Sequence, residues 1–226
     1  MSTFTTRESK NPKILWYFRT VNGTSGNRLG FLKYTTYEEE CMLMKILALL
    51  GSTRKNGNSE YLANKILEGT DHTIVTLADK HIEPITDMRH TEEGFSPVDD
   101  DYEDLVRLML EHDVLLFATP LYWYGMSGPM KNFFDRWSQY LRDERFNLKE
   151  ELTKKKAYVV ITGGSSANIK GLPLVQQFNY IFEFVNMEFT DYMIGAGVRP
   201  GEIMNDLPSL RKAERWNKQF RDANPL

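Results

Sequence analysis

From residue 44 onward, short apolar runs alternate with longer segments whose apolar residues recur at helical spacing. We expect strands at 46–50, 73–77, 114–118, 157–162 and 189–194. We expect helices at 59–68, 100–112, 129–141, 174–185 and 208–221. A continuous apolar run such as 46–50 is typical of a strand that is buried on both faces. The alternation therefore predicts an α/β fold, in which helices cover both faces of a parallel sheet.

Residues 1–43 do not follow this alternation. Two apolar stretches, 14–18 and 29–34, flank the polar segment VNGTSGNR, a pattern that favours a hairpin added to a sheet edge. The charged run YEEE that follows is equally consistent with a disordered leader. We predict a functional domain at 44–226 that is preceded by an N-terminal extension at 1–43.

Composition excludes several classes of function. A net charge of −3 and a pI near 5.9 are unlike those of a nucleic-acid-binding protein. No apolar run approaches the roughly 18 residues that cross a bilayer, and the N-terminus lacks the pattern of a signal peptide. A lone Cys41 excludes an internal disulfide and a cysteine-ligated metal site within one chain. We expect a cytoplasmic protein that binds neither nucleic acid nor membrane.

The segment GSTRKNGNS, residues 51–59, joins the first expected strand to the first expected helix. Ligands of open parallel sheets bind beyond the carboxyl ends of the strands. A helix start there offers free backbone N–H groups and a positive dipole end, which favour an anion. The side chains that could help to hold a phosphate are those of Ser52, Thr53, Arg54, Asn58 and Ser59. The alternative is a plain turn in which Asn58 or Ser59 caps the helix.

This loop does not match the usual nucleotide motifs. A P-loop needs a Lys and a Ser or Thr directly after its second glycine, and no such pair follows Gly57. The G-x-G-x-x-G pattern fails because Thr53 stands where the second glycine should be. Nucleotide hydrolysis is therefore not supported.

Two further loops follow expected strands. The segment TPLYWYGMSGPMKNFF, residues 119–134, places Leu121, Tyr122, Trp123 and Tyr124 in succession at a strand end. A flat heteroaromatic ligand would give these aromatic rings a partner, and a hydrophobic plug is the alternative. In TGGSSANIKG, residues 162–171, the pair Gly163 and Gly164 allows a ligand edge close to the backbone, although such a pair alone is usually a turn.

These three loops follow the first, third and fourth strands. In a sheet of order 2-1-3-4-5 those strand ends are adjacent. A phosphate that is joined by a polar chain to a flat ring fits this arrangement, and flavin mononucleotide (FMN) is the candidate that the pattern favours.

The segments KILALLGSTRKNGNS, TPLYWYGMSGPMKNFFDRW and ITGGS resemble the flavodoxin-like NAD(P)H-dependent oxidoreductases, the group of FMN reductases, azoreductases and quinone reductases. The resemblance covers about residues 44–195. It implies a flavodoxin-like three-layer α/β/α sandwich with a five-stranded parallel sheet of order 2-1-3-4-5, bound FMN, and usually a homodimer or a higher homo-oligomer.

The resemblance also implies roles for individual residues. Ser52, Arg54, Asn58 and Ser59 would hold the phosphate. The residues that would line the isoalloxazine ring are Pro120, Leu121, Tyr122, Trp123 and Tyr124. Gly163 and Gly164 would approach its pyrimidine edge.

No metal site is expected. Related proteins often carry a cysteine cluster after the second strand, and HIEPITDMRHTEEG at 81–94 contains no cysteine. The four histidines lack ligand spacing and are expected to be solvated. The acidic run 99–101 precedes a helix, where its charge suits the dipole. We expect Lys131, Asp135 and Arg136 to pair on a helix surface or at a subunit contact.

The predicted activity is hydride transfer from NADPH or NADH to flavin N5, followed by transfer to a small-molecule acceptor. The cofactor carries this chemistry, so no dedicated acid–base residue is expected. The alternative is a flavodoxin-type electron carrier without NAD(P)H oxidase activity, but such carriers tend to be markedly acidic and this chain is nearly balanced.

Overall fold

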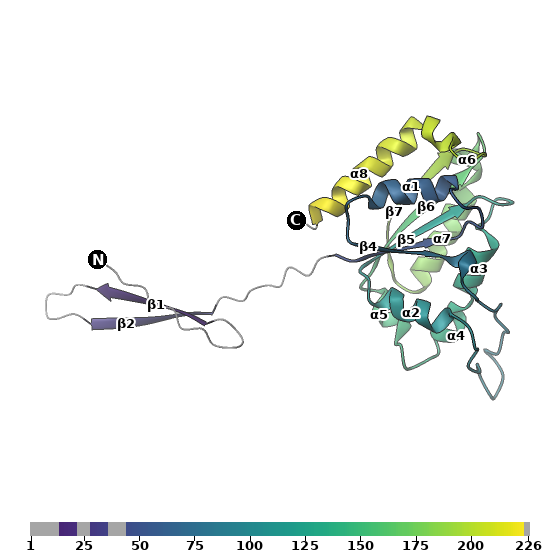
Figure 1. The fold of residues 1–226 in the computed structure, drawn as a ribbon. Coiled ribbons are helices and arrows are strands. Elements are labelled where there is room, and N and C mark those ends of the chain that lie inside the picture. The colour runs from purple at the N-terminus through teal and green to yellow at the C-terminus, as the bar shows by residue number, and fades with distance from the viewer. Residues whose placement is uncertain (1–13, 22–27, 36–43, 224–226) are drawn as a thin grey trace. The chain divides into compact units, whose positions relative to one another are not determined.

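The structure is a computed structural model that describes residues 14–21, 28–35 and 44–223 (Figure 1). The chain divides into two units, Met1–Met42 and Leu43–Leu226. In the first unit, β1 (Ile14–Val21) pairs antiparallel with β2 (Arg28–Thr35) in a two-stranded sheet of their own. The rest of residues 1–43, on which the disordered-leader alternative falls, lies outside the described residues. The domain division after residue 43 stays a prediction.

The second unit is built on a five-stranded sheet whose neighbouring strands are all parallel (Figure 1). Its strands are β3 (Ile46–Leu50), β4 (His72–Thr76), β5 (Val114–Pro120), β6 (Lys156–Gly163) and β7 (Glu188–Ala196). Their order in the sheet is β4-β3-β5-β6-β7. Counted within this unit, that order is 2-1-3-4-5, which confirms the predicted topology.

Helices follow the strands. The longer ones are α1 (Asn58–Leu67), α2 (Tyr102–Leu110), α3 (Gly128–Asp135), α7 (Leu172–Phe184) and α8 (Leu207–Ala223). Shorter ones are α4 (Trp137–Tyr140), α5 (Leu148–Leu152), α6 (Ala167–Lys170) and the 3-10 turns η1 (Leu77–Asp79) and η2 (Glu202–Asn205). The expected helix at 129–141 is therefore two helices, α3 and α4. No helix in the described part of the chain is long and apolar enough to cross a membrane.

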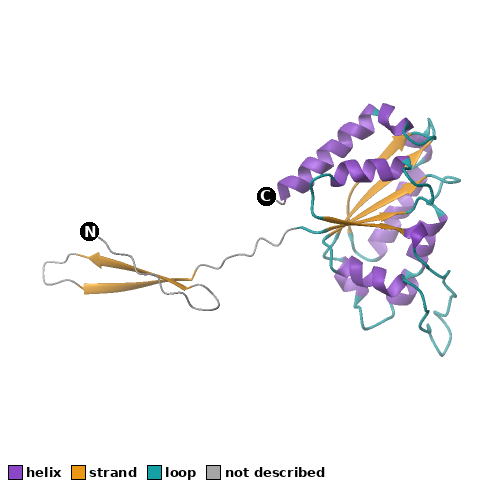
Figure 2. Cartoon of the chain, viewed as in Figure 1, coloured by secondary structure: helices purple, strands orange, loops and turns teal. Residues whose placement is uncertain are grey.

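Two hydrophobic cores, one on each face of the sheet, hold three layers together (Figure 2). Successive β3 residues point to opposite faces, so Ile46, Ala48 and Leu50 pack with α1 and α8, while Leu47 and Leu49 pack on the other side. The core on the side of Leu47 and Leu49 contains aromatic rings in mutual contact: Phe117, Phe133, Phe134, Phe178 and Phe182. Burial on both faces explains why the strand runs are continuously apolar.

A buried ion pair fastens the long loop after η1 to α3 and α4. The side chains of Arg136 and Asp100 are each 1% exposed and form a salt bridge. The Arg136 guanidinium also donates to the carbonyl oxygen of Glu83 at 2.9 Å and lies 4.7 Å from the centre of the Tyr102 ring. These contacts connect three segments that are distant in the sequence.

The expected surface pairing of Arg136 is therefore wrong. Lys131 and Asp135, one helical turn apart, do pair on the surface, with 2.5 Å between Nζ and Oδ1. Arg136 is one residue further on, about 100° around the helix, and this turns its side chain inward. Asp100 accepts a hydrogen bond from the Tyr102 N–H at 3.1 Å, near the start of α2, but its main partner is Arg136.

We expect Asp100→Asn to lower the free energy of unfolding at pH 7 by about 3–5 kcal/mol, because it leaves the Arg136 charge buried without a counter-charge. Burial alone would raise the pKa of Asp100, but hydrogen bonds from Arg136 and from the Glu83 and Tyr102 N–H groups outweigh it and lower that pKa. A lowered carboxyl pKa contributes stability above the unfolded-state value, near 3.8, that is lost as the pH falls through the folded-state value.

Urea unfolding between pH 7 and pH 3 tests this prediction. The difference between wild type and Asp100→Asn should shrink as the pH falls below 3.8. The control is Asp135→Asn, which removes an exposed pair and should cost at most about 1 kcal/mol. Equal losses in the two variants, or a difference that does not depend on pH, would contradict the role of the buried pair.

Candidate functional site

The carboxyl ends of β3, β5, β6 and β7 form one edge of the sheet, and hydrogen bonds continue past the strands there. The Gly51 N–H donates to Ala118 O at 2.8 Å, and the Leu121 N–H donates to Thr162 O at 2.7 Å. The Gly197 N–H donates to Gly163 O at 2.7 Å. The three loops that the sequence singled out are therefore neighbours, and the loop after β7 joins them.

Two adjoining cavities lie at this edge. The first, of about 140 Å³, is lined by most of the predicted site residues: Ser52, Arg54, Asn58, Ser59, Pro120, Leu121, Tyr122, Gly163 and Gly164. The second, of about 420 Å³, is lined by Trp123 and Tyr124 and shares Leu121 and Gly164 with the first. Thr53 is apart from both, because it lines a third cavity beside Lys131 and Asn132.

The turn between β3 and α1 is held by its own side chains. The Ser52 hydroxyl accepts from the Arg54 N–H at 3.1 Å and donates to Arg54 O at 3.2 Å. The Glu60 carboxylate accepts from the Gly57 N–H at 3.3 Å. The first backbone bond of α1 runs from the Tyr61 N–H to Gly57 O at 2.9 Å. The N–H groups of residues 58–60 therefore precede the helical ladder, a position that favours an anion.

The loop after β7 closes one side of the first cavity. The Asn58 side-chain amide donates to Arg199 O at 3.0 Å and accepts from the Gly201 N–H at 3.1 Å, so that side chain is engaged by the fold. Arg54 Nη1 donates to Val198 O at 2.9 Å. A Cβ at Gly197 would lie 2.8 Å from Asn58 Nδ2. Glycine at this position therefore lets the loop approach the start of α1.

The sequence prediction missed four residues that line the first cavity: Gly57, Thr162, Gly197 and Val198. Gly57 and Thr162 lie within loops that had been singled out. Gly197 and Val198 belong to the segment GAGVRPG after the last strand. Gly195 and Gly197, which follow the last expected strand, could have indicated these residues. The segment was not considered because the expected strand ends at 194 and the next expected helix begins at 208.

Trp123 and Tyr124 occupy a tight two-residue turn. The Tyr122 N–H donates to Gly125 O at 3.0 Å, and the Gly125 N–H donates to Tyr122 O at 2.9 Å. Trp123 has φ 48° and Tyr124 has φ 66°, the left-handed region that Asn and Gly usually occupy in such turns. A large residue there costs about 1–3 kcal/mol.

These two aromatic rings are exposed. The exposed fraction is 96% for Trp123 and 56% for Tyr124. The alternative of a hydrophobic plug is therefore wrong for this pair, since a plug would bury it. An exposed aromatic pair in a strained turn offers its ring faces to a ligand.

Ser127 connects the loop between β3 and α1 to the loop that carries the aromatic turn. Its buried hydroxyl donates to Gly51 O at 2.6 Å, and its N–H donates to Thr119 Oγ1 at 3.1 Å. The same hydroxyl accepts from the Met130 N–H at 3.4 Å and caps α3. One side chain thus fixes the spacing between the two halves of the site.

The site offers an anion-binding helix start in one cavity and exposed aromatic rings in the next. Among the described residues, no group of three or more His, Cys, Asp and Glu side chains is placed to hold a metal ion. His81 and His90 are exposed, as expected. His112 is instead buried and bonded to Leu108 O and Thr73 Oγ1, which makes it structural.

The parallel sheet of order 2-1-3-4-5 and the site at its carboxyl edge define a protein of the flavodoxin-like fold. Residues 44–191 match the model of the NADPH-dependent FMN reductase family. The chain belongs to this family.

Individual proteins agree with this assignment. YwqN of Bacillus subtilis, described provisionally as an NAD(P)H-dependent FMN-containing oxidoreductase, is 48% identical over 177 residues, which are 78% of this chain and 98% of YwqN. The structure of a Trp repressor binding protein from Bacillus subtilis has a TM-score of 0.65 at 45% identity and covers 76% of this chain and 99% of its own. An iron–sulfur flavoprotein of Methanocaldococcus jannaschii is 30% identical over 81% of this chain and 98% of its own.

We expect Gly51→Ala to destabilise the fold by about 1–3 kcal/mol. Its new Cβ would lie 2.6 Å from Ser127 Oγ and 2.9 Å from Met130 Cβ, and both of these residues are buried. Gly128→Ala is the matched control, because its Cβ would meet no atom within 4 Å. Urea unfolding measures both. A Gly51→Ala protein as stable as the Gly128→Ala protein would contradict the tight contact between the two loops.

Proposed function

We propose that the chain is an FMN-dependent NAD(P)H oxidoreductase in which FMN spans the two adjoining cavities. Bound FMN would accept a hydride from NAD(P)H at N5 and reduce a small acceptor, such as a quinone, an azo or nitro compound, or free flavin. The observation that carries this proposal is the continuity of the anion-binding helix start with the aromatic turn, through the shared residues Leu121 and Gly164. Membership of the FMN reductase family supports it.

The phosphate of FMN fits the start of α1. The N–H groups of residues 58–60 precede the helical ladder, and Ser52, Arg54 and Ser59 line the same cavity. Because the Asn58 amide is engaged with the loop after β7, its backbone N–H is the group that it can offer. Arg54 supplies a positive charge in this cavity. Thr53 lines neither cavity and has no part in this proposal.

The isoalloxazine ring fits the other two loops. Pro120, Leu121 and Tyr122 line the first cavity, and Trp123 and Tyr124 line the second. Within the described residues, the N–H groups of Trp123, Tyr124 and Gly164 donate to no protein acceptor. They are available to the polar edge of a flat ring and to the negative charge that builds there on reduction.

The oligomeric state and the location belong to the same proposal. The resemblance to dimeric flavin reductases favours a homodimer, and an apolar groove of about 570 Å³ over α7 supports an interface. Tyr180 and Phe184, at the rim of this groove, are about two-thirds exposed. The cytoplasm stays a prediction from the sequence.

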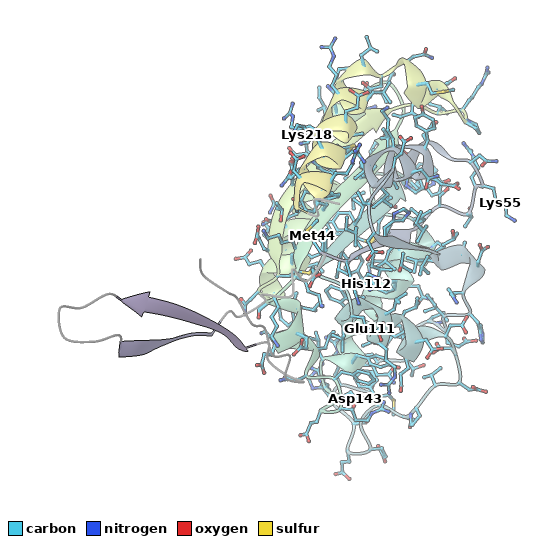
Figure 3. All side chains as sticks on the ribbon, turned by 60° about the vertical axis from the view of Figure 1, so that its left-hand side comes forward. Met44, Lys55, Glu111, His112, Asp143 and Lys218 are labelled. Atoms are coloured by element: carbon cyan, nitrogen blue, oxygen red, sulfur yellow. The ribbon has the colours of Figure 1, made fainter. Side chains whose placement is uncertain are left out.

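A flavin-binding variant tests the assignment of the phosphate site. We expect Arg54→Gln to raise the Kd for FMN about tenfold, since it removes a charge that lines the cavity. Lys55→Gln is the matched control, because Lys55 carries the same charge, is exposed and lies at the outer edge of the molecule (Figure 3). Fluorescence titration of the flavin-free protein with FMN measures both Kd values. An equal change in the two variants would reject a specific role for Arg54.

The activity itself is tested with the whole protein. We expect the absorbance spectrum of the purified protein to show a bound flavin, which bleaches when NADPH or NADH is added without oxygen. A quinone should then restore the colour. A flavin that stays oxidised in the presence of either donor would indicate an electron carrier. Failure to bind FMN at all would reject both functions.

A further inference from the structure

The second cavity contains a feature that FMN binding does not require. It lies between the aromatic turn and the segment 164–170 that leads into and forms α6. Its volume of about 420 Å³ falls in the range of small-molecule sites. Besides Trp123 and Tyr124, its lining includes the side chains of Ser165, Ser166 and Lys170. This opening therefore combines flat rings, two hydroxyl groups and a cation.

Lys170 is placed against the aromatic wall. Its Nζ lies 5.9 Å from the centre of the Tyr124 ring, within the range of a weak cation–π contact. None of the ion pairs among the described residues includes Lys170, and no carboxylate lines the cavity. Its positive charge is therefore not neutralised by the protein and faces a space that a ligand can enter.

The ring faces beside it are held open by the backbone. Trp123 and Tyr124 have positive φ values and cannot relax to an ordinary strand without breaking the Tyr122–Gly125 pair. Trp123 remains almost fully exposed. A planar molecule that stacks on these rings would cover this apolar area and bring any negative substituent toward Lys170.

We propose that the part of this cavity beside Lys170 that a bound FMN ring leaves open selects planar aromatic substrates that carry an anionic group. The ring stacks on Trp123 and Tyr124, and the anion pairs with Lys170 with support from the hydroxyls of Ser165 and Ser166. This inference rests on the proposed function for its role in turnover. The binding of the ligand does not rest on the proposed function, because all the residues that would hold the ligand are residues of the protein.

Two kinds of substrate share this chemistry: an aromatic acceptor with a sulfonate or carboxylate, and the phosphate-bearing dinucleotide donor. The test therefore uses matched probes. Anthraquinone-2-sulfonate and 2-(hydroxymethyl)anthraquinone have the same ring system and differ in charge. NADP⁺ represents the donor. Isothermal titration calorimetry of each with the oxidised, full-length protein measures binding without turnover.

We expect Lys170→Met to raise the Kd for anthraquinone-2-sulfonate about three- to tenfold and to leave the Kd for the neutral anthraquinone unchanged. Lys170→Arg should restore the affinity, and added salt should shrink the effect of Lys170→Met. Trp123→Ala should weaken the binding of both anthraquinones, since it removes an aromatic ring on which they stack. Lys149→Met is the control, because Lys149 also lies over an aromatic ring, that of Phe184, and lines neither cavity.

A higher Kd for NADP⁺ in Lys170→Met, with the Kd values of both anthraquinones unchanged, would assign the anionic group to the dinucleotide donor. The selection for an anionic aromatic ligand would then stand. If the Kd of each of the three probes is the same in Lys170→Met as in wild type, the proposal is overturned. That result is separate from a failure of the proposed function, which would show as an absence of bound flavin or of bleaching by NAD(P)H.

Discussion

The site depends on one hydrogen bond between two loops. The buried Ser127 hydroxyl donates to the carbonyl oxygen of Gly51, where the loop 51–57 leaves β3, and it also caps α3 after the aromatic turn. Gly51 has no room for a side chain against Ser127, so the two loops meet at backbone distance. Parallel strands place their ends at one edge, and this contact sets how far apart the two halves of a ligand site lie there.

Stability and ligand binding place opposite demands on this edge. In the fold, Arg136 and Asp100 form a buried pair whose charges compensate each other. At the surface, Trp123 and Tyr124 keep positive φ values, a conformation that costs stability, and Trp123 remains almost fully exposed. The rigid sheet below tolerates that cost. The FMN proposed above would account for rings displayed in this way.

The fold was predictable because buried strands and helices produce regular patterns of apolar residues in the sequence. The run 46–50 is apolar at every position, and it forms β3 with the expected bounds, buried on both faces. Contacts between distant segments were not predictable. Nothing near Arg136 indicates that its partner is Asp100, and nothing in the loop 51–59 shows that the chain path carries Thr53 away from its neighbours. The loop at Gly197 was missed because no helix directly follows it.

We propose that one FMN molecule spans the start of α1 and the aromatic turn. A crystal structure of the protein from crystals grown with FMN would decide this. We expect electron density for the phosphate at the N–H groups of residues 58–60, continuous with a ring beside Tyr122–Tyr124 and Gly163–Gly164. Density for the phosphate at any other place, or for a ring that does not touch these two loops, would contradict it.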